Sequence, residues 1–320
     1  MNIAQNSTGQ GVEYRQIDAT QAGQRLDNFL ISKLKGVPRS HIYRILRKGQ
    51  VRINSGRRAA DYRLRAGDVV RIPPLRMAPA DRPRAAAADG PLELCILYED
   101  AHLMAVDKPA GLAVHGGSGV SLGLIEHLRS QRPRARFLEL AHRLDRDTSG
   151  CLLLAKRRSA LLGLHAQLRE ARVKKRYSAL VQGRWDDEAR HVELPLAKYR
   201  LRSGERMVEV SQGGKQAVTR FIAKQRFVDC TLVEIELLTG RTHQVRVHAA
   251  YLGHPVAGDR KYGDREFNQR MARLGLKRLF LHAGAVGFKH PHTGSRMVLK
   301  APLPAEFTDL LDCLKHEASL

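Results

Sequence analysis

The sequence predicts an α+β protein made of a small basic domain and a larger domain with a mixed or antiparallel sheet. Three observations lead to this prediction. The chain has 320 residues, more than one small core usually contains. Residues 75–91 interrupt the hydrophobic pattern with Pro, Ala and Arg, which is typical of an interdomain linker. Beyond this linker, several short apolar runs of strand type follow one another without a helix between them.

The small basic domain is expected over residues 13–74, after a loose polar tail at residues 1–12. Apolar residues at helical spacing predict a first helix within residues 26–34. A second short helix is expected over residues 40–48, with Ser40 as its N-cap. Short strands should follow, because Val and Ile residues alternate with turn residues after the second helix.

The larger α+β domain is expected over residues 92–320, where strand and helix patterns are both frequent. Strands are predicted at residues 94–98, 103–106, 151–155, 177–181, 218–223, 231–238, 279–286 and 297–299. Helices are predicted at residues 122–130, 159–171, 242–252 and 306–316. This order favours a mixed or antiparallel sheet over a doubly wound parallel one.

Basic side chains dominate the charge of the chain. Lys and Arg number 55 against 32 Asp and Glu, a formal net charge of +23 with His neutral. An excess spread along so much of the chain indicates a polyanionic partner, most commonly nucleic acid. The four cysteines form no Cys-x-x-Cys pair, which predicts reduced thiols. With no recognisable leader or membrane span, we expect a soluble, cytoplasmic protein.

The second predicted helix concentrates positive charge on one face. Arg44, Arg47 and Lys48 are spaced to share this face, with Arg39 beside them, while apolar residues cover the other side. An ordinary amphipathic helix with a solvated polar face has a similar pattern, but such a face usually mixes charges of both signs. Because acidic residues are missing from this helix, we interpret the four cations as RNA-binding residues.

Three segments of the basic domain, at residues 23–30, 38–49 and 51–54, resemble the S4 RNA-binding domain. That module occurs in many ribosome-related proteins. The resemblance therefore implies RNA binding and leaves open whether the protein is an enzyme.

The segment His-Arg-Leu-Asp-Arg-Asp-Thr-Ser-Gly at residues 142–150 is the strongest candidate for a catalytic site. It groups charged side chains directly before the apolar strand predicted at residues 151–155, at the rim of a core. A carboxylate there can act as nucleophile, general base, metal ligand or half of an ion pair. The most frequent role of an Asp beside Arg is the ion pair, and residue chemistry alone does not choose between Asp145 and Asp147.

Three further segments carry polar residues at predicted strand ends and turns. Residues 106–115 place Lys108 in a Pro/Gly turn after a strand, and residues 174–177 place Tyr177 at the start of one. Residues 238–248 form a turn that opens a helix, in which Arg246 lies between two valines. A guanidinium buried in this way needs a carboxylate partner.

Together, the four segments resemble the RluA family of pseudouridine synthases over nearly the whole chain, with no departure from the family pattern within them. The resemblance implies that Asp145, rather than Asp147, is the catalytic carboxylate and that Arg143 fills the space left by a flipped uridine. It further implies that Tyr177 stacks on the flipped base and helps to move its proton, and that Arg246 pairs with Asp145 and keeps it ionised. Leu238 and Val245 are expected to line the pocket.

The same resemblance implies a catalytic domain with a largely antiparallel central sheet and no metal or organic cofactor. The expected partner is 23S ribosomal RNA or a large-subunit assembly intermediate, and a monomer is expected. The residue types suit this reaction. A carboxylate can stabilise or trap positive charge at C1′ when the N1–C1′ bond breaks, and a ring and a planar cation can offset the free energy of extruding a stacked base.

Two other functions remain as alternatives from the residues alone. A non-catalytic RNA-binding or ribosome-assembly factor would share the charge and the S4-like segments, but it need not keep Asp145, Tyr177 and Arg246 together. A metal-dependent nuclease would need clustered carboxylates. His290 and His292 lie in a Pro/Gly turn and are interpreted instead as RNA contacts or surface residues.

Overall fold

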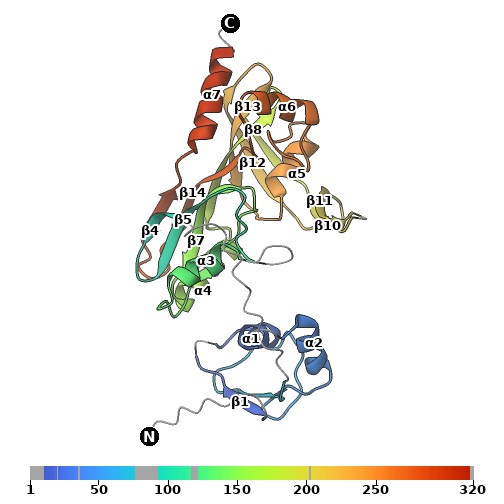
Figure 1. The fold of residues 1–320 in the computed structure, drawn as a ribbon, viewed down its shortest axis with the longest axis vertical. Helices are drawn as coiled ribbons and strands as arrows, with labels where there is room; N and C mark the ends of the chain where they lie inside the picture. The colour runs from blue at the N-terminus through green and yellow to red at the C-terminus, as the bar shows by residue number, and fades with distance from the viewer. Residues whose placement is uncertain are drawn as a thin grey trace. The chain divides into compact units, whose positions relative to one another are not determined.

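The computed structural model describes residues 11–19, 21–34, 37–75, 93–116, 122–201 and 203–317. The chain divides into two compact units, which comprise residues 1–88 and residues 89–320. Figure 1 draws both units, and each is described here by itself. Most of the predicted tail and nearly all of the predicted linker lie outside the described residues, so the exact domain boundaries stay predictions.

The first unit contains two helices and a small antiparallel sheet in the order β1-β3-β2. Its elements are β1 (Glu13–Gln16), α1 (Leu26–Lys33), α2 (Arg39–Arg47), β2 (Arg52–Ile53) and β3 (Val69–Ile72). The apolar faces of both helices and the sheet enclose one core, which includes Phe29, Ile42 and Ile45. Both predicted helices are therefore present, and each buries the apolar residues that predicted it.

Helix α2 begins two residues earlier than the expected N-cap allows. Its N-cap is Pro38, and the helix starts at Arg39, so the prediction of Ser40 as N-cap is wrong. The physical reason is that proline is compatible with a helix start. Its ring restricts φ to a value near that of a helix, and the N–H that it lacks would have no partner within the helix at this position. Gly49 follows the helix with φ +66°, a conformation that glycine adopts without steric penalty.

The second unit is built on a ten-stranded mixed sheet (Figure 1). The strand order is β4-β5-β7-β14-β8-β13-β12-β9, with β15 added to β14 and β6 to β7. Only β7 and β14 run parallel; every other neighbouring pair is antiparallel, which confirms the predicted sheet type. The strands are β4 (Cys95–Glu99), β5 (Leu103–Lys108), β6 (Glu139–Leu140), β7 (Ser149–Ala155), β8 (Lys174–Gln182), β9 (Ala189–Glu193), β12 (Val218–Arg226), β13 (Cys230–Leu237), β14 (Leu281–Lys289) and β15 (Arg296–Lys300). A separate hairpin is formed by β10 (Leu196–Arg200) and β11 (Arg206–Val210).

The helices of the second unit pack against this sheet. They are α3 (Leu124–Gln131), α4 (Arg158–Arg169), α5 (Gln244–Tyr251), α6 (Arg265–Arg273) and α7 (Ala305–Glu317). Four of them were predicted, and α6 was not, because only Phe267 and Met271 are buried in an otherwise polar segment. A local signal for α6 does exist, since Asp264 caps the helix by accepting a hydrogen bond from the Phe267 N–H at 2.7 Å. None of the helices in the described ranges is long and apolar enough to cross a membrane.

Strand β7 is the central element that positions the site. All of its residues are buried, because its side chains alternate between cores on the two faces of the sheet. Leu152 and Leu154 belong to the core on one face, and Cys151 and Leu153 to the core on the other. This packing holds the start of β7, and hence the charged segment that precedes it, rigidly at one edge of the fold.

Candidate active site

Asp145 lies in the short connection between β6 and β7. Its side chain is half-buried, whereas Asp147, two residues later, is exposed. The Thr148 N–H donates to the Asp145 carbonyl oxygen at 3.2 Å, which closes a turn around the aspartate. Among the described residues, no N–H or O–H donates a hydrogen bond to the Asp145 carboxylate, and no Lys, Arg or His side chain forms an ion pair with it. The carboxylate therefore has its lone pairs available to a substrate.

Lys108 anchors the Asp145 turn from inside the fold. Its side chain is fully buried, and its ammonium donates to the carbonyl oxygens of Pro109, Leu112 and Arg146 at 2.8–2.9 Å. Burial lowers the pKa of Lys108 to about 8, against the opposing charges of Asp147 and Asp145. Because Arg146 follows Asp145 directly, these bonds hold the backbone of the turn that carries Asp145, here called the catalytic turn, against the Pro/Gly turn that follows β5.

A cleft opens beside Asp145, and we call it the catalytic cleft. It is formed by the turn before β7, by β8 and by the N-terminal part of α5 with its preceding loop. Its lining residues are Arg143, Leu144, Asp145, Thr148, Tyr177, Leu237, Gly240, Arg241, Thr242, His243, Gln244, Val245, Arg246 and Leu281. The structure thus brings together Arg143, Asp145, Tyr177, Val245 and Arg246, which come from three separate segments of the sequence.

Tyr177 presents its ring to this cleft from β8, where it pairs with Ile235 of β13. It is 8% exposed, and burial raises the pKa of its phenol, with the nearby Asp145 charge adding to the shift. The phenol is therefore protonated at neutral pH. This state suits a stacking surface and a hydrogen-bond donor better than a proton acceptor.

Arg246 does not pair with Asp145, so the predicted ion pair is wrong in its partner. The guanidinium binds Asp259 instead, with Nε and Nη2 each 2.6 Å from a carboxylate oxygen. Arg246 is 4% exposed and Asp259 is 1% exposed. Burial alone would raise the pKa of Asp259, but the Arg246 hydrogen bonds and charge outweigh it and the pKa is lowered. The prediction of a buried guanidinium with a carboxylate partner is otherwise confirmed.

His243 is a cleft residue that the sequence analysis did not single out. It adopts the left-handed conformation, with φ +54°, at the start of α5. Its Nδ1 lies 2.8 Å from the Tyr262 hydroxyl, which also accepts a hydrogen bond from the Val208 N–H of β11. Burial lowers the pKa of His243, partly opposed by Asp145. Its neutral imidazole ties the start of α5 to the hairpin formed by β10 and β11.

The apolar wall of the cleft contains Leu237 rather than Leu238. Leu238 is 46% exposed and does not line the cleft, so that prediction is wrong. The reason is the two-residue alternation of β13, in which Val233, Ile235 and Leu237 share one face. The alternation was visible in the sequence and would have identified Leu237. Val245 lines the cleft from α5, as expected, and is buried.

In the first unit, the structure places the predicted cations of α2 on one face. Arg44, Arg47 and Lys48 are all exposed, while the apolar residues between them are buried. The side chain of Arg39 lies outside the described residues. No Asp or Glu occurs within α2, so this face carries unbalanced positive charge.

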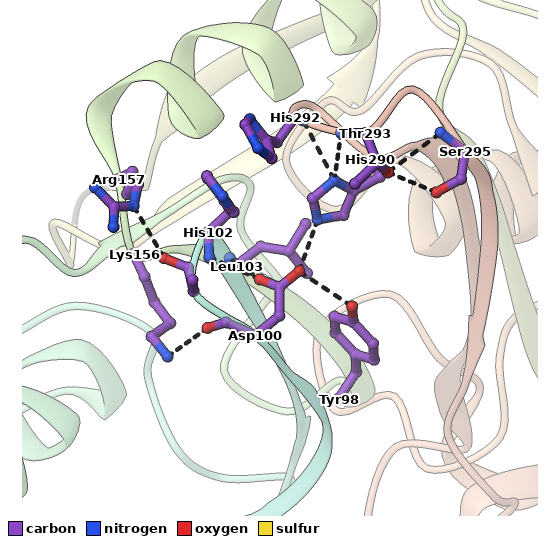
Figure 2. Close-up of polar contacts among 11 residues, drawn as sticks. Tyr98, Asp100, His102, Leu103, Lys156, Arg157, His290, His292, Thr293 and Ser295 are labelled. Carbon is purple, nitrogen blue, oxygen red and sulfur yellow. Dashed lines mark hydrogen bonds and ion pairs between the residues drawn. The ribbon is translucent and has the colours of Figure 1, made fainter.

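A second polar cluster lies at the start of β5, whereas Lys108 lies at the end of this strand (Figure 2). His290 is buried and its Nε2–H donates to Asp100 at 2.8 Å, because its Nδ1 accepts from the N–H groups of His292 and Thr293. His292 is exposed, and its ring stacks on His102 at 4.0 Å. Within the described ranges, no group of three or more His, Cys, Asp or Glu side chains is arranged to hold a metal ion. His290 is therefore a structural residue that joins two turns, not a surface residue.

Comparison with known proteins decides the family. The family model for RNA pseudouridylate synthase matches residues 102–251, and that for the S4 domain matches residues 24–70. The chain is 56% identical, over 310 residues, to Ribosomal large subunit pseudouridine synthase C from Escherichia coli strain K12. This match covers 94% of the chain and 96% of the relative. The chain belongs to the RNA pseudouridylate synthase family.

Other members of the family agree with this assignment. The Pasteurella multocida strain Pm70 protein of the same name is 53% identical over 313 residues, which cover 97% of this chain and 96% of that protein. Among solved structures, Human RNA Pseudouridylate Synthase Domain Containing 4 has a TM-score of 0.56 and 28% identity, covering 69% of this chain and 93% of its own. This pseudouridine synthase thus joins an S4 domain to the catalytic fold, and the nuclease and pure binding-factor alternatives are set aside.

Proposed function

We propose that this pseudouridine synthase isomerises uridines in 23S ribosomal RNA, with Asp145 as its catalytic carboxylate. The observation that carries the proposal is the Asp145 carboxylate itself, which lies at the catalytic cleft beside Tyr177 and is unpaired within the part of the chain that the structure describes. Relatives that are 53–56% identical over almost their whole length carry a name that specifies the large ribosomal subunit. The net charge of +23 also favours RNA as the substrate.

The reaction breaks the N1–C1′ bond, turns the uracil and forms a C5–C1′ bond, so its atoms balance without an external reactant. Positive charge that develops at C1′ is stabilised by a carboxylate, which makes Asp145 the reacting group. The target uridine must leave its stack to reach the cleft, and the exposed Arg143 guanidinium at the rim is suited to occupy its place. The ring of Tyr177 then offers a stacking surface for the extruded base.

The Arg246–Asp259 pair gives the cleft a fixed positive group. Asp259 engages Nε and Nη2, and no described residue accepts a hydrogen bond from Nη1. Burial lowers the pKa of Arg246, but the hydrogen bond and charge of Asp259, with a smaller contribution from the charge of Asp145, raise it overall. We infer that Arg246 and Asp145 attract each other through space rather than through a direct ion pair.

We further propose that the cationic face of α2 contacts phosphates of the same RNA. Replacing Arg44, Arg47 and Lys48 together with Gln should weaken RNA binding and reduce its salt dependence, because each phosphate contact releases counterions. The catalytic rate at saturating RNA should change little. Equal affinity for wild type and this variant would contradict the role of α2.

One experiment tests the function itself. Purified protein is incubated without metal with 23S ribosomal RNA transcribed in vitro, which contains no modified bases, and pseudouridine is then mapped by chemical labelling. We expect a small set of modified uridines in RNA of unchanged length. Absence of pseudouridine would overturn the proposal, and shortened RNA would indicate a nuclease. Monomeric state and cytoplasmic location are further expectations, measurable by light scattering and by cell fractionation.

A further inference from the structure

A second cleft lies directly beside the catalytic cleft, and we call it the basic cleft. The two clefts share Arg246 as a lining residue, and its partner Asp259 lines the basic cleft. The other walls are the Pro/Gly turn after β5, the exposed Asp147, the loop before α6 and the segment that enters β14. The lining residues are Ala110, Gly111, Asp147, Arg246, Gly258, Asp259, Arg260, Lys261, Lys277, Arg278 and Leu279.

The walls of the basic cleft are held firmly. Gly258 has φ +73°, and a Cβ at this position would collide with the carbonyl oxygen of Arg278, so the two backbone segments are in close contact. The Phe280 N–H donates to the Ala257 carbonyl oxygen at 2.9 Å, which joins the same segments. Arg278 packs 4.1 Å from the ring of Phe307. The cations of both segments are therefore presented from a preorganised surface, and ordering them on binding costs little conformational entropy.

The cations of the basic cleft exceed its available acidic groups. Lys261 and Arg278 have carboxylate partners in Glu205 and Glu306, outside the cleft lining. Arg260 and Lys277 are exposed, and neither forms an ion pair with a carboxylate in the described part of the chain. The Asp259 charge is already neutralised by Arg246.

Asp147 is thus the one lining carboxylate without an ion pair in the described ranges, against two unpaired and two partly balanced cations. A net positive cleft of this kind favours an anionic ligand. Its side chains offer ammonium and guanidinium donors, which bind phosphate oxygens.

We propose that the basic cleft binds the backbone phosphate of a nucleotide next to the target uridine. This inference rests on the proposed function, because the flipped nucleotide in the catalytic cleft is joined covalently to its neighbours. The shared boundary at Arg246 places the basic cleft where one of the two adjoining phosphates continues the chain. Contact there orients the RNA strand relative to Asp145 without reading the base sequence.

The test compares two double variants of the full-length protein that remove the same charge. Arg260→Gln with Lys277→Gln changes the basic cleft, and Arg296→Gln with Lys300→Gln changes exposed cations on β15, outside both clefts. The dissociation constant for an unmodified ribosomal RNA fragment is measured at several salt concentrations, together with the single-turnover rate at saturating RNA. Substrates carrying one neutral methylphosphonate, either 5′ or 3′ of the target uridine, are then compared with the unaltered RNA.

We expect the cleft variant to bind RNA about ten-fold more weakly, with a salt slope smaller than wild type by about 1, and to retain its saturated rate. The salt slope of the control variant should be closer to the salt slope of wild type. One of the two methylphosphonates should weaken RNA binding by wild type about ten-fold. The same methylphosphonate should weaken RNA binding by the cleft variant less than two-fold.

The inference is overturned if the cleft variant behaves as the control does, or if both methylphosphonates weaken the two proteins equally. Failure of the proposed function would look different, because wild type itself would then form no pseudouridine whereas the salt slopes could still differ.

Discussion

Arg246 and Asp259 form a buried bidentate ion pair, and this pair, not one with Asp145, positions the cation of the catalytic cleft. Both contacts are 2.6 Å, and neither side chain exceeds 4% exposure. Asp259 also accepts hydrogen bonds from the N–H groups of Lys261 and Tyr262. The carboxylate thus fixes both the guanidinium and the loop that leads to α6.

Removing one partner of this pair should be costly. We expect Asp259→Ala to lower the free energy of unfolding by about 3–5 kcal/mol, because it leaves an unpaired charge in the interior. Trp185 is the only tryptophan of the chain and is buried in the second unit, so its fluorescence reports unfolding by denaturant. Asp229→Ala is the control, because Asp229 pairs with Arg270 at the surface and should contribute less than about 1 kcal/mol. Equal effects of the two variants would contradict this account.

Asp145 and Asp147 provide a matched pair for the chemistry. Asp145→Asn should reduce pseudouridine formation by at least about 1,000-fold while RNA affinity stays within two-fold, because it removes the reacting carboxylate and little else. Asp147→Asn should retain most of its single-turnover rate at saturating RNA, since the Asp147 side chain is exposed and lines the basic cleft rather than the catalytic cleft. Single-turnover assays and filter binding measure both quantities. Activity in the first variant, or its loss in the second alone, would reassign the catalytic residue.

Lys108 should make turnover sensitive to alkaline pH. Its pKa of about 8 means that the ammonium loses a proton as the pH rises through this value, well below the 10.5 of a free lysine. One of the three carbonyl oxygens then loses its donor, and the turn that carries Asp145 loosens. We expect the single-turnover rate at saturating RNA to fall above pH 8.

The Lys108→Met variant identifies the titrating group. Misplacement of the catalytic turn should lower its rate by about 100-fold. Its remaining activity should lack the fall near pH 8. If the single-turnover rates of wild type and variant both fell near pH 8, the titration would belong to another group. Trp185 fluorescence checks that the variant is folded.

Leu237 and Leu238 are neighbours, but Leu237 is half-buried and lines the catalytic cleft, whereas Leu238 is exposed. Leu237→Ala should lower kcat/KM by about ten-fold, because it removes part of the apolar wall that we propose to contact the base. Leu238→Ala should change kcat/KM by less than two-fold, since Leu238 lies outside the cleft lining. Steady-state kinetics with an RNA fragment measure both values. A larger loss in Leu238→Ala would place the base on the other face of β13.

Asp100 should contribute to stability at neutral pH and lose this contribution in acid. Burial raises the pKa of Asp100, but hydrogen bonds from four groups, the Leu103 and His102 N–H groups, His290 and Tyr98, outweigh burial and lower the pKa to about 2 (Figure 2). The folded pKa is therefore below the unfolded value of 3.8. The stabilisation is present above pH 4 and disappears as the pH falls towards 2.

From this pKa shift, the contribution of Asp100 is at most about 2 kcal/mol. Denaturant unfolding at pH 6, 4 and 3, followed through Trp185, measures it. Asp100→Asn should lower stability at pH 6 and show a weaker loss on acidification than wild type. An unchanged difference between the two proteins at all three pH values would mean that Asp100 does not titrate with unfolding.

Local patterns in the sequence determined most of the secondary structure. Short apolar runs predicted β5, β7 and β8, and a partial alternation of apolar and charged residues predicted β13, because a half-exposed strand presents successive side chains to opposite faces. Helical spacing likewise predicted α2, and with it the exposed cations. The motif around Asp145 identified the catalytic segment through its family resemblance, which the comparisons with relatives support at the level of the family.

Tertiary structure alone decided which side chains meet across the site. The family resemblance gave Asp145 as the partner of Arg246, but the path of the chain after α5 brings Asp259 within 2.6 Å instead. The meeting of the Lys277 and Arg260 segments in one basic cleft has the same origin. Periodicity arises from backbone geometry within one element, so it is readable from sequence. Ion pairs and clefts depend on distances between segments far apart in the chain, which are set only when the sheet and its cores have packed.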